Sequence, residues 1–169
     1  QLNSKDVGET TRSKISRLLN HMSKKKIDNI FISAPENVSW LLNLRGYDNP
    51  NSPIPNCRLI LSKSRELYLF SSKYKILNIR NKIPLKVNFY EENDFYFVID
   101  KLKGINFSID EISCSIYFEK LISSKFYINA KVDPCYYFKS IKNVTELNNM
   151  EKAHIEDGVA LTKFLYWIK

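Results

Sequence analysis

Short apolar runs that alternate with helix-like segments constrain the fold of this chain most strongly. Two of the strand-like runs are separated only by the tight turn at residues 63–66, which predicts a hairpin. The strand-like runs cover residues 29–33, 57–62, 67–70, 86–90, 105–109 and 126–130. Helical periodicity covers residues 10–24, 74–82, 94–103 and 115–123. This order predicts an α/β fold, with a mixed sheet of about six strands, part antiparallel and part parallel, flanked by helices.

The sequence Arg-Gly-Tyr-Asp at residues 45–48 is a charged turn directly after a short apolar segment. Val38 and Leu42 stand at helical spacing, which predicts a helix before the turn. Gly46 suits a left-handed exit from that helix. The loop that follows, residues 48–56, contains three prolines and is too rigid for a helix. We therefore look for functional residues in this turn and loop.

The composition limits the class of protein. A chain of 169 residues with 44% hydrophobic and 13% aromatic residues can bury the core of one ordinary domain. No apolar run approaches the roughly 20 residues that span a bilayer, and the first residues lack a signal-peptide pattern, so we expect a soluble, cytoplasmic protein without membrane contact. Cys57, Cys114 and Cys135 are widely spaced within apolar strings, which favours buried free thiols.

The net charge of +8 raises the possibility of nucleic-acid binding, but the distribution of the charge argues against it. Lys24, Lys25 and Lys26 stand at the predicted end of a helix, where cations complement the helix dipole. The other lysines are scattered among Asn, Ile and Tyr rather than gathered on one face. A solvated basic surface is the better interpretation, and we expect no nucleic-acid partner.

A long helix is predicted at the end of the chain. Asn143 and Glu146 are spaced as in a capping box, after residues 137–142, which we expect to be extended. One face of the helix carries Leu147, Met150, His154, Leu161, Phe164, Leu165 and Ile168. Gly158 stands in mid-helix, which predicts a close contact of this helix with the domain that would follow. Because no stop signal ends this helix and the chain begins at Gln1, we expect a piece of a longer protein.

The residues that could perform chemistry are few. His21 and His154 are the two histidines, and no zinc-binding His-Glu-x-x-His run, phosphate-binding glycine loop or Gly-x-Ser-x-Gly elbow is present. His154 and Asp157 stand at i and i+3, which favours a hydrogen bond on the helix surface over a metal site. We therefore assign no catalytic residue and no metal ligand to this chain.

Two segments about one domain length apart carry a family resemblance. Residues 36–48, Glu-Asn-Val-Ser-Trp-Leu-Leu-Asn-Leu-Arg-Gly-Tyr-Asp, followed by Pro50 and Pro53, resemble the motif in the non-catalytic domain of cytosolic-type Xaa-Pro aminopeptidases (aminopeptidase P). Residues 9–14 resemble the helix that opens the middle domain of three-domain members. A second set of residues resembles the junction that leads into that family's catalytic domain: Lys142, Asn143, Glu146, Met150, Ala153, His154, Asp157, Gly158, Val159, Ala160 and Trp167.

The resemblance implies a creatinase-type N-terminal fold and a separate pita-bread catalytic domain that would follow Lys169. That domain binds two divalent ions, commonly manganese, through two Asp, one His and two Glu. It would be the partner of this chain, and a peptide with proline in second position would be the substrate of the parent. The parent is expected to be a homodimer, and this fragment an inactive monomer. We expect residues 1–132 to form the non-catalytic domain and residues 133–169 the linker and first catalytic-domain helix.

Each candidate residue has a structural alternative. Arg45 either binds carbonyl groups at the end of its helix or faces the interdomain cleft, and the first is favoured. Asp48 either begins the turn before Pro50 or pairs with Arg45. The remaining cleft or interdomain candidates are Trp40, which is expected in the core, and Pro50 and Pro53 in the rigid loop. The helix-packing candidates are His154, Asp157 and Gly158.

Two other functions remain open at this point. These alternatives are a stand-alone protein-interaction module derived from a peptidase-like fold and a basic nucleic-acid-binding domain. The family resemblance favours a domain of an Xaa-Pro aminopeptidase that shapes the active-site cleft without supplying the nucleophile.

Overall fold

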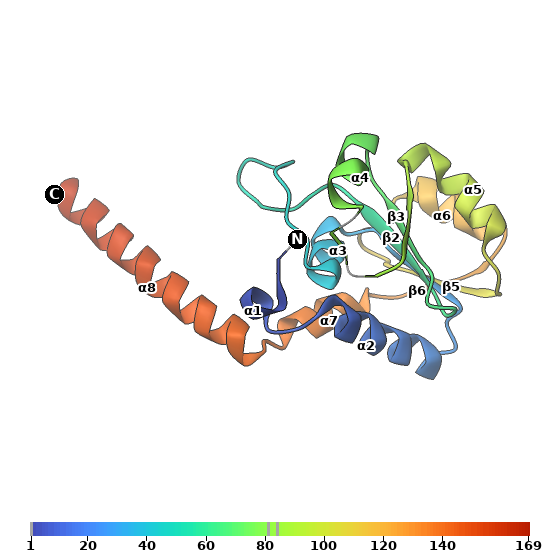
Figure 1. Ribbon diagram of the computed structural model, residues 1–169, viewed down its shortest axis with the longest axis horizontal. Helices are drawn as coiled ribbons and strands as arrows, with labels where there is room; N and C mark the ends of the chain where they lie inside the picture. The colour runs from blue at the N-terminus through green and yellow to red at the C-terminus, as the bar shows by residue number, and fades with distance from the viewer. Residues whose placement is uncertain (1, 81, 84) are drawn as a thin grey trace.

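The computed structural model describes residues 2–80, 82–83 and 85–169. Within these residues, six strands form one sheet in the order β4-β3-β2-β1-β5-β6, with helices around it (Figure 1). The strands are β1 (Asn29–Ile32), β2 (Arg58–Ser62), β3 (Leu67–Phe70), β4 (Val87–Tyr90), β5 (Asn106–Ile109) and β6 (Tyr127–Ala130). The helices are α1 (Ser4–Val7), α2 (Thr11–Lys24), α3 (Pro35–Leu42), α4 (Lys73–Ile79), the 3₁₀ turn η1 (Glu92–Asp94), α5 (Phe95–Lys101), α6 (Ile116–Ser123), α7 (Pro134–Ser140) and α8 (Val144–Trp167).

The sheet is mixed, as the order of the segments predicted. β2 runs antiparallel to both β1 and β3, and β2 with β3 forms the expected hairpin. The pairs β1–β5, β5–β6 and β3–β4 are parallel. Parallel neighbours need a crossover connection, and helices α4, α5 and α6 lie in the segments that connect the later strands.

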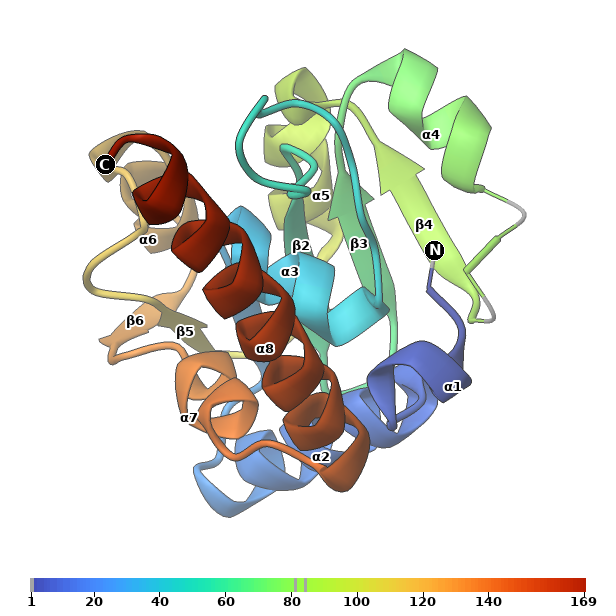
Figure 2. The same cartoon turned by 90° about the vertical axis from the view of Figure 1, so that its left-hand side faces the viewer.

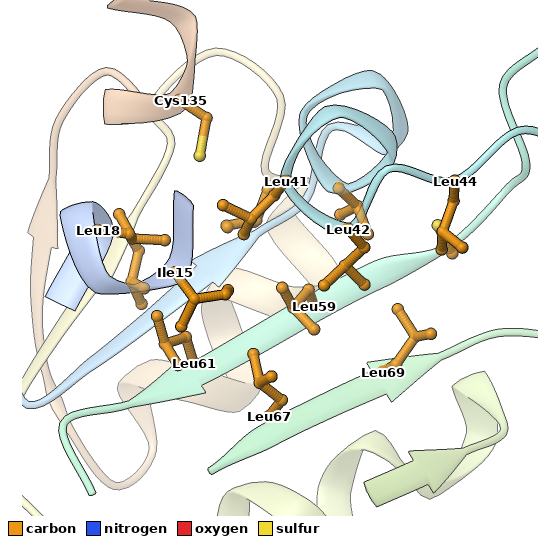
Figure 3. Close-up of a cluster of buried hydrophobic side chains, with 14 of the residues drawn as sticks. Ile15, Leu18, Leu41, Leu42, Leu44, Leu59, Leu61, Leu67, Leu69 and Cys135 are labelled. Atoms are coloured by element: carbon orange, nitrogen blue, oxygen red, sulfur yellow. The ribbon is translucent and has the colours of Figure 1, made fainter. Parts of the chain in front are cut away.

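Both faces of the sheet are buried. Because successive side chains of a strand point to opposite faces, Leu59 and Leu61 of β2 enter one core while Ile60 enters the other. The first core lies beneath α2 and α3, and Figure 3 shows the leucines of β2 and β3 facing those helices. The second core is aromatic: the ring centroids of Phe95 and Phe118 are 4.7 Å apart. Apolar packing on two faces therefore holds a thin, six-strand sheet.

The segment after β6 differs from the expectation. Residues 137–142 were predicted to be extended, but α7 covers most of them. Asp133 caps this helix by accepting a hydrogen bond from the Cys135 amide at 2.8 Å, and Pro134 occupies a first-turn position that favours helix formation. Cys135 is fully buried in the first core. The periodicity of this short segment did not predict a helix, but the Asp133-Pro134 pair was a local signal for a helix start.

The last helix projects away from the sheet (Figure 1). Its predicted capping box is present: Asn143 Oδ1 accepts from the Glu146 amide at 3.0 Å, and the Glu146 carboxylate accepts from the Asn143 amide at 3.0 Å. None of the residues of α8 is buried. In the part of the chain that the structure describes, no helix is both long enough and apolar enough to cross a membrane.

The three cysteines are free, as expected, but they are not equally covered. Cys57 and Cys135 are buried, whereas Cys114 is only half-buried, so the prediction of three buried thiols is wrong for Cys114. Cys114 lies between the end of β5 and α6, where the chain passes over the rim of the second core.

Candidate functional site

The 45–48 turn lines a pocket of about 440 Å³ beside α4. The wall of the pocket on the α4 side contains Tyr74 and Lys75, and Cys57, directly before β2, contributes as well. Arg45, Lys75 and Lys82 line the pocket together with Asp48, so basic side chains outnumber the one carboxylate. The structure thus brings the predicted turn together with a segment about thirty residues further along, a pairing that spacing in the sequence did not indicate.

The helix before the turn ends earlier than predicted. α3 stops at Leu42, and Asn43, rather than Gly46, adopts the left-handed conformation with φ of 54°. Asn is one of the few residues with a side chain that tolerates this region. The prediction of a left-handed exit at Gly46 is therefore wrong.

Gly46 is required for a different reason. Its amide donates to the Pro53 carbonyl at 3.1 Å, which brings the proline loop against the turn. A Cβ atom at position 46 would lie 2.6 Å from Pro55 Cβ and 2.9 Å from Pro55 Cα, and these distances are too short for any side chain. The close approach of two backbone segments, and not a helix exit, explains this glycine.

Asn43 joins the turn to the N-terminal part of the chain. Its Oδ1 accepts from Lys14 Nζ at 2.8 Å, and its Nδ2 donates to the Glu9 carbonyl at 3.0 Å. Its own carbonyl accepts from the Leu2 amide at 2.8 Å. Asn43 is 3% exposed, so these are buried bonds whose loss would leave polar atoms unpaired. The Asn of the Asn-Leu-Arg-Gly sequence is thus the anchor of the turn.

Lys14 is a residue that the sequence analysis did not single out. Its side chain is 1% exposed, and Nζ also donates to the Trp40 carbonyl at 2.9 Å, where α3 ends. A cation at this position complements the negative end of the helix dipole. Burial lowers the pKa of Lys14 to about 8, although the nearby Glu146 and Glu9 carboxylates oppose that shift. Lys14 stands four residues before Leu18, on the apolar stripe of α2, and this spacing was the signal in the sequence that its side chain is buried.

Arg45 and Asp48 do not pair with each other, which corrects one of the two alternatives for Asp48. Arg45 donates to the Leu44 carbonyl at 2.7 Å, in line with carbonyl binding just after the helix. Asp48 instead pairs with Lys75 of α4 and accepts a hydrogen bond from the Asn56 amide. Partial burial alone would raise the pKa of Asp48, but these two hydrogen bonds outweigh it, so the pKa lies below its usual value. Asp48 therefore closes the proline loop and ties it to α4.

The other candidates of the turn region are half-buried or exposed. Trp40 is half-buried, and its ring packs against the first core with Lys14 Nζ 4.4 Å from the ring centroid. Pro50 and Pro53 are exposed in the loop. Tyr47 is fully exposed at the tip of the turn. The turn and loop thus present rigid backbone and one aromatic side chain to the outside.

The helix-packing candidates lie on the exposed α8. No atom of a neighbouring segment lies within 4 Å of the Cβ position built at Gly158, so the contact predicted there is not made within the described residues. His154 and Asp157 are exposed, and no hydrogen bond joins their side chains in the described part of the chain. Large apolar side chains are exposed along the same helix, at Leu147, Met150, Leu161, Phe164, Leu165 and Ile168.

Within the residues that the structure describes, no three His, Cys, Asp or Glu side chains are grouped so that they could hold a metal ion. The 45–48 turn is held at both ends: the buried side chains of Lys14 and Asn43 fix its start, and the ion pair of Asp48 with Lys75 of α4 fixes its end. Such a turn is suited to holding a neighbouring group in position.

Comparisons with known proteins match the resemblance seen in the two motifs. The Creatinase/Prolidase N-terminal domain family matches residues 1–146. Xaa-Pro aminopeptidase 1 of Dictyostelium discoideum is 29% identical over 171 residues, and the probable Xaa-Pro aminopeptidase P of Neurospora crassa is 30% identical over 182 residues. Both alignments cover 99% of this chain, but only 27% and 26% of the relatives. The chain thus spans about a quarter of the length of these relatives.

Solved structures share the fold. The X-prolyl aminopeptidase of Caenorhabditis elegans, described as a cytosolic enzyme with a di-nuclear active site, matches with a TM-score of 0.81 at 22% identity, over 99% of this chain and 28% of that one. The prolidase from Pyrococcus horikoshii OT3 matches with a TM-score of 0.68 at 19% identity, over 88% of this chain and 41% of that one. With the family match extending over most of its length, the chain belongs to the Creatinase/Prolidase N-terminal domain family.

Proposed function

We propose that this chain is the non-catalytic domain of an Xaa-Pro aminopeptidase, a metallopeptidase that removes the N-terminal residue preceding proline. The single observation that carries the proposal is the alignment of Xaa-Pro aminopeptidase 1 with 99% of the chain, last helix included. The remainder of the parent, with two Asp, one His and two Glu, would hold two divalent ions, expected to be manganese. The parent would act in the cytoplasm, as a homodimer.

The role proposed for this domain is to shape one wall of the active-site cleft and to pack against the catalytic domain. Two features of the structure support it. The 45–48 turn and the proline loop are held rigidly, so they can meet a neighbour with little loss of entropy. The apolar side chains of α8 are about half exposed, and their burial against the catalytic domain would be favourable. Residues 133–169 would then be the linker, whose helix α7 packs on the present domain, and the first helix of the catalytic domain.

The test compares this 169-residue chain with the polypeptide expressed from the complete coding sequence. Both are incubated with Mn²⁺ and a peptide that has proline in second position, and release of the first residue is measured. We expect turnover by the complete polypeptide and none by the chain alone, because the metal ligands lie outside it. Cleavage by the chain at a rate comparable with the complete polypeptide would overturn the proposal.

The cleft role has its own variant, Gly46→Ala in the complete polypeptide. The added methyl group displaces the proline loop at Pro55, and we expect a loss of about tenfold in kcat/KM because misplaced positioning elements slow catalysis. Thermal unfolding of the same variant in the 169-residue chain separates this effect from loss of folding. An unchanged kcat/KM in a folded variant would exclude the loop from the cleft.

A coding sequence without the five metal ligands would favour the alternative of a stand-alone interaction module. The exposed apolar residues of α8 would then be its binding surface.

A further inference from the structure

The first turns of α8 are fastened to α1, which lies beside them (Figure 2). Asn143 Nδ2 donates to the Val7 carbonyl at 2.9 Å, and Asn149 Nδ2 donates to the Asp6 carbonyl at 3.0 Å. Asn143 therefore has two roles, because its Oδ1 caps α8 while its Nδ2 binds α1. This small contact lies where α8 leaves the body of the molecule.

Gly8 lies at the centre of the contact. It ends α1 with φ of +73°, and its amide donates to the Ser4 carbonyl at 2.8 Å. A Cβ at this position would lie 2.2 Å from Asn143 Oδ1 and 2.8 Å from Thr145 Cβ. Both the backbone conformation and the approach of α8 therefore require glycine.

Both ends of the N-terminal segment that contains α1 and Gly8 are bound to Asn43 of the candidate site. The Leu2 amide donates to the Asn43 carbonyl, and the Glu9 carbonyl accepts from Asn43 Nδ2. Residues 2–9, here called the N-terminal latch, thus contact α8 with their middle part and the anchor of the 45–48 turn with both ends.

We propose that the N-terminal latch holds α8 at a fixed angle to the 45–48 turn, and that Gly8 and Asn143 are positioning residues of the parent enzyme. The inference rests on the proposed function, in which the turn and α8 both meet the catalytic domain. A helix of 24 residues extends about 36 Å, so a rotation of about 10° at its first turn moves its far end by about 6 Å. A small change at the latch would therefore displace the catalytic domain from the cleft wall.

The test measures the orientation of α8 in this chain by double electron–electron resonance. Spin labels are placed through Lys120→Cys on α6 and Lys163→Cys on α8, in a Cys114→Ser background, since the other two thiols are buried. We expect a single narrow distance distribution. Gly8→Ala is expected to abolish it and give a broad distribution, because α8 must leave its contact with α1.

Asn143→Asp separates the latch from the helix cap. The carboxylate can still accept from the Glu146 amide, but it cannot donate to the Val7 carbonyl. We expect unchanged helix content by circular dichroism together with loss of the narrow distance. Gly158→Ala is the matched control, since no neighbouring segment lies within 4 Å of its Cβ position, and the distance should stay narrow.

A narrow distance in folded Asn143→Asp would overturn the inference, and this variant decides the matter even if Gly8→Ala fails to fold. The measurement involves no catalysis. The distance measurement can therefore contradict the latch proposal while the peptidase assay supports the proposed function, and the reverse outcome is also possible.

Discussion

At the scale of single residues, Lys14 combines a charge with almost complete burial. Two acceptors at the end of α3 hold its ammonium group, and Trp40 covers it. Burial still favours the neutral amine, and the pKa of about 8 in the folded protein is below the ordinary 10.5. Between these two values the unfolded chain binds more protons than the folded protein, so this residue makes the folded protein more stable as the pH rises.

We therefore predict a pH-dependent difference between the wild type and Lys14→Met. From pH 8 to pH 10, the free energy of unfolding of the wild type should rise relative to the variant by at most about 1.4 kcal/mol per pH unit. The comparison cancels the ionisation of thiols and tyrosines, which is common to both proteins. Urea unfolding at each pH measures the difference, and Lys24→Met, at the exposed end of the same helix, is the control. A difference that is independent of pH would contradict the assignment of the shifted pKa to Lys14.

At the scale of the elements, Asp28 joins three inner strands of the sheet, β2, β1 and β5, at one of their ends. Its Oδ2 accepts from the amides of Ile105 and Asn106 at 2.7 and 3.0 Å, just before β5, and its Oδ1 pairs with Lys63 at the end of β2. Gly104 allows this approach, since a Cβ there would lie 2.5 Å from Asp28 Cβ. The Ile105 hydrogen bond, then Lys63 and Asn106, lower the pKa of Asp28 to about 2.

Asp28→Asn should lower the free energy of unfolding at pH 7 by about 1–2 kcal/mol, because the charged acceptor becomes a neutral one and the ion pair with Lys63 is lost. The folded pKa is below the unfolded value of 3.8, so the stabilisation is present above pH 4 and is lost as the pH falls towards 2. The free energy of unfolding, measured as the pH is lowered from 4 to 2, should accordingly fall less for the variant than for the wild type. Asp100→Asn, at an exposed carboxylate on α5, is the control, and an equal loss of stability in both variants would refute a specific role of Asp28.

At the scale of the whole molecule, α7 is part of the body that the sheet organises. Cys135 of α7 and Cys57 before β2 are buried, and burial raises the pKa of Cys57 to about 12 and that of Cys135 well above its usual value. Cys114 is half-buried, with a pKa raised by burial to about 11. The thiolate is the reactive form, so the exposure and the pKa of each thiol together determine the order in which the three cysteines react.

We predict that iodoacetamide at pH 8 modifies Cys114 first in the folded protein, and that Cys57 and Cys135 react only after unfolding. Peptide mass spectrometry with time measures the order, and the same reaction in urea is the control in which all three thiols should react. Modification of Cys135 as early as Cys114 would mean that α7 opens from the first core while the sheet stays folded.

The six strands and most of the helices could be predicted from sequence because their signals are local. Hydrophobic period and turn residues determine whether a short segment, such as the hairpin of β2 and β3, is a strand, and the mixed sheet follows from the order of the segments. The Asn143 cap of α8 is local for the same reason. α7 was missed because its short segment has little periodicity, and its burial depends on a contact with α3.

The candidate site was located by the sequence but built by the tertiary structure. The Arg-Gly-Tyr-Asp turn and its proline loop were identified from residue types alone. The partners of the turn were not: Asn43 is held by Lys14 and Glu9, Asp48 by Lys75, and each partner is at least 27 residues away along the chain. Propensity and spacing report on neighbours within a few residues, whereas charge pairing, burial and the fit of a glycine depend on which distant segments the fold brings into contact. For that reason the sequence determined the sheet and the position of the turn, and only the tertiary structure decided what holds the turn and where α8 points.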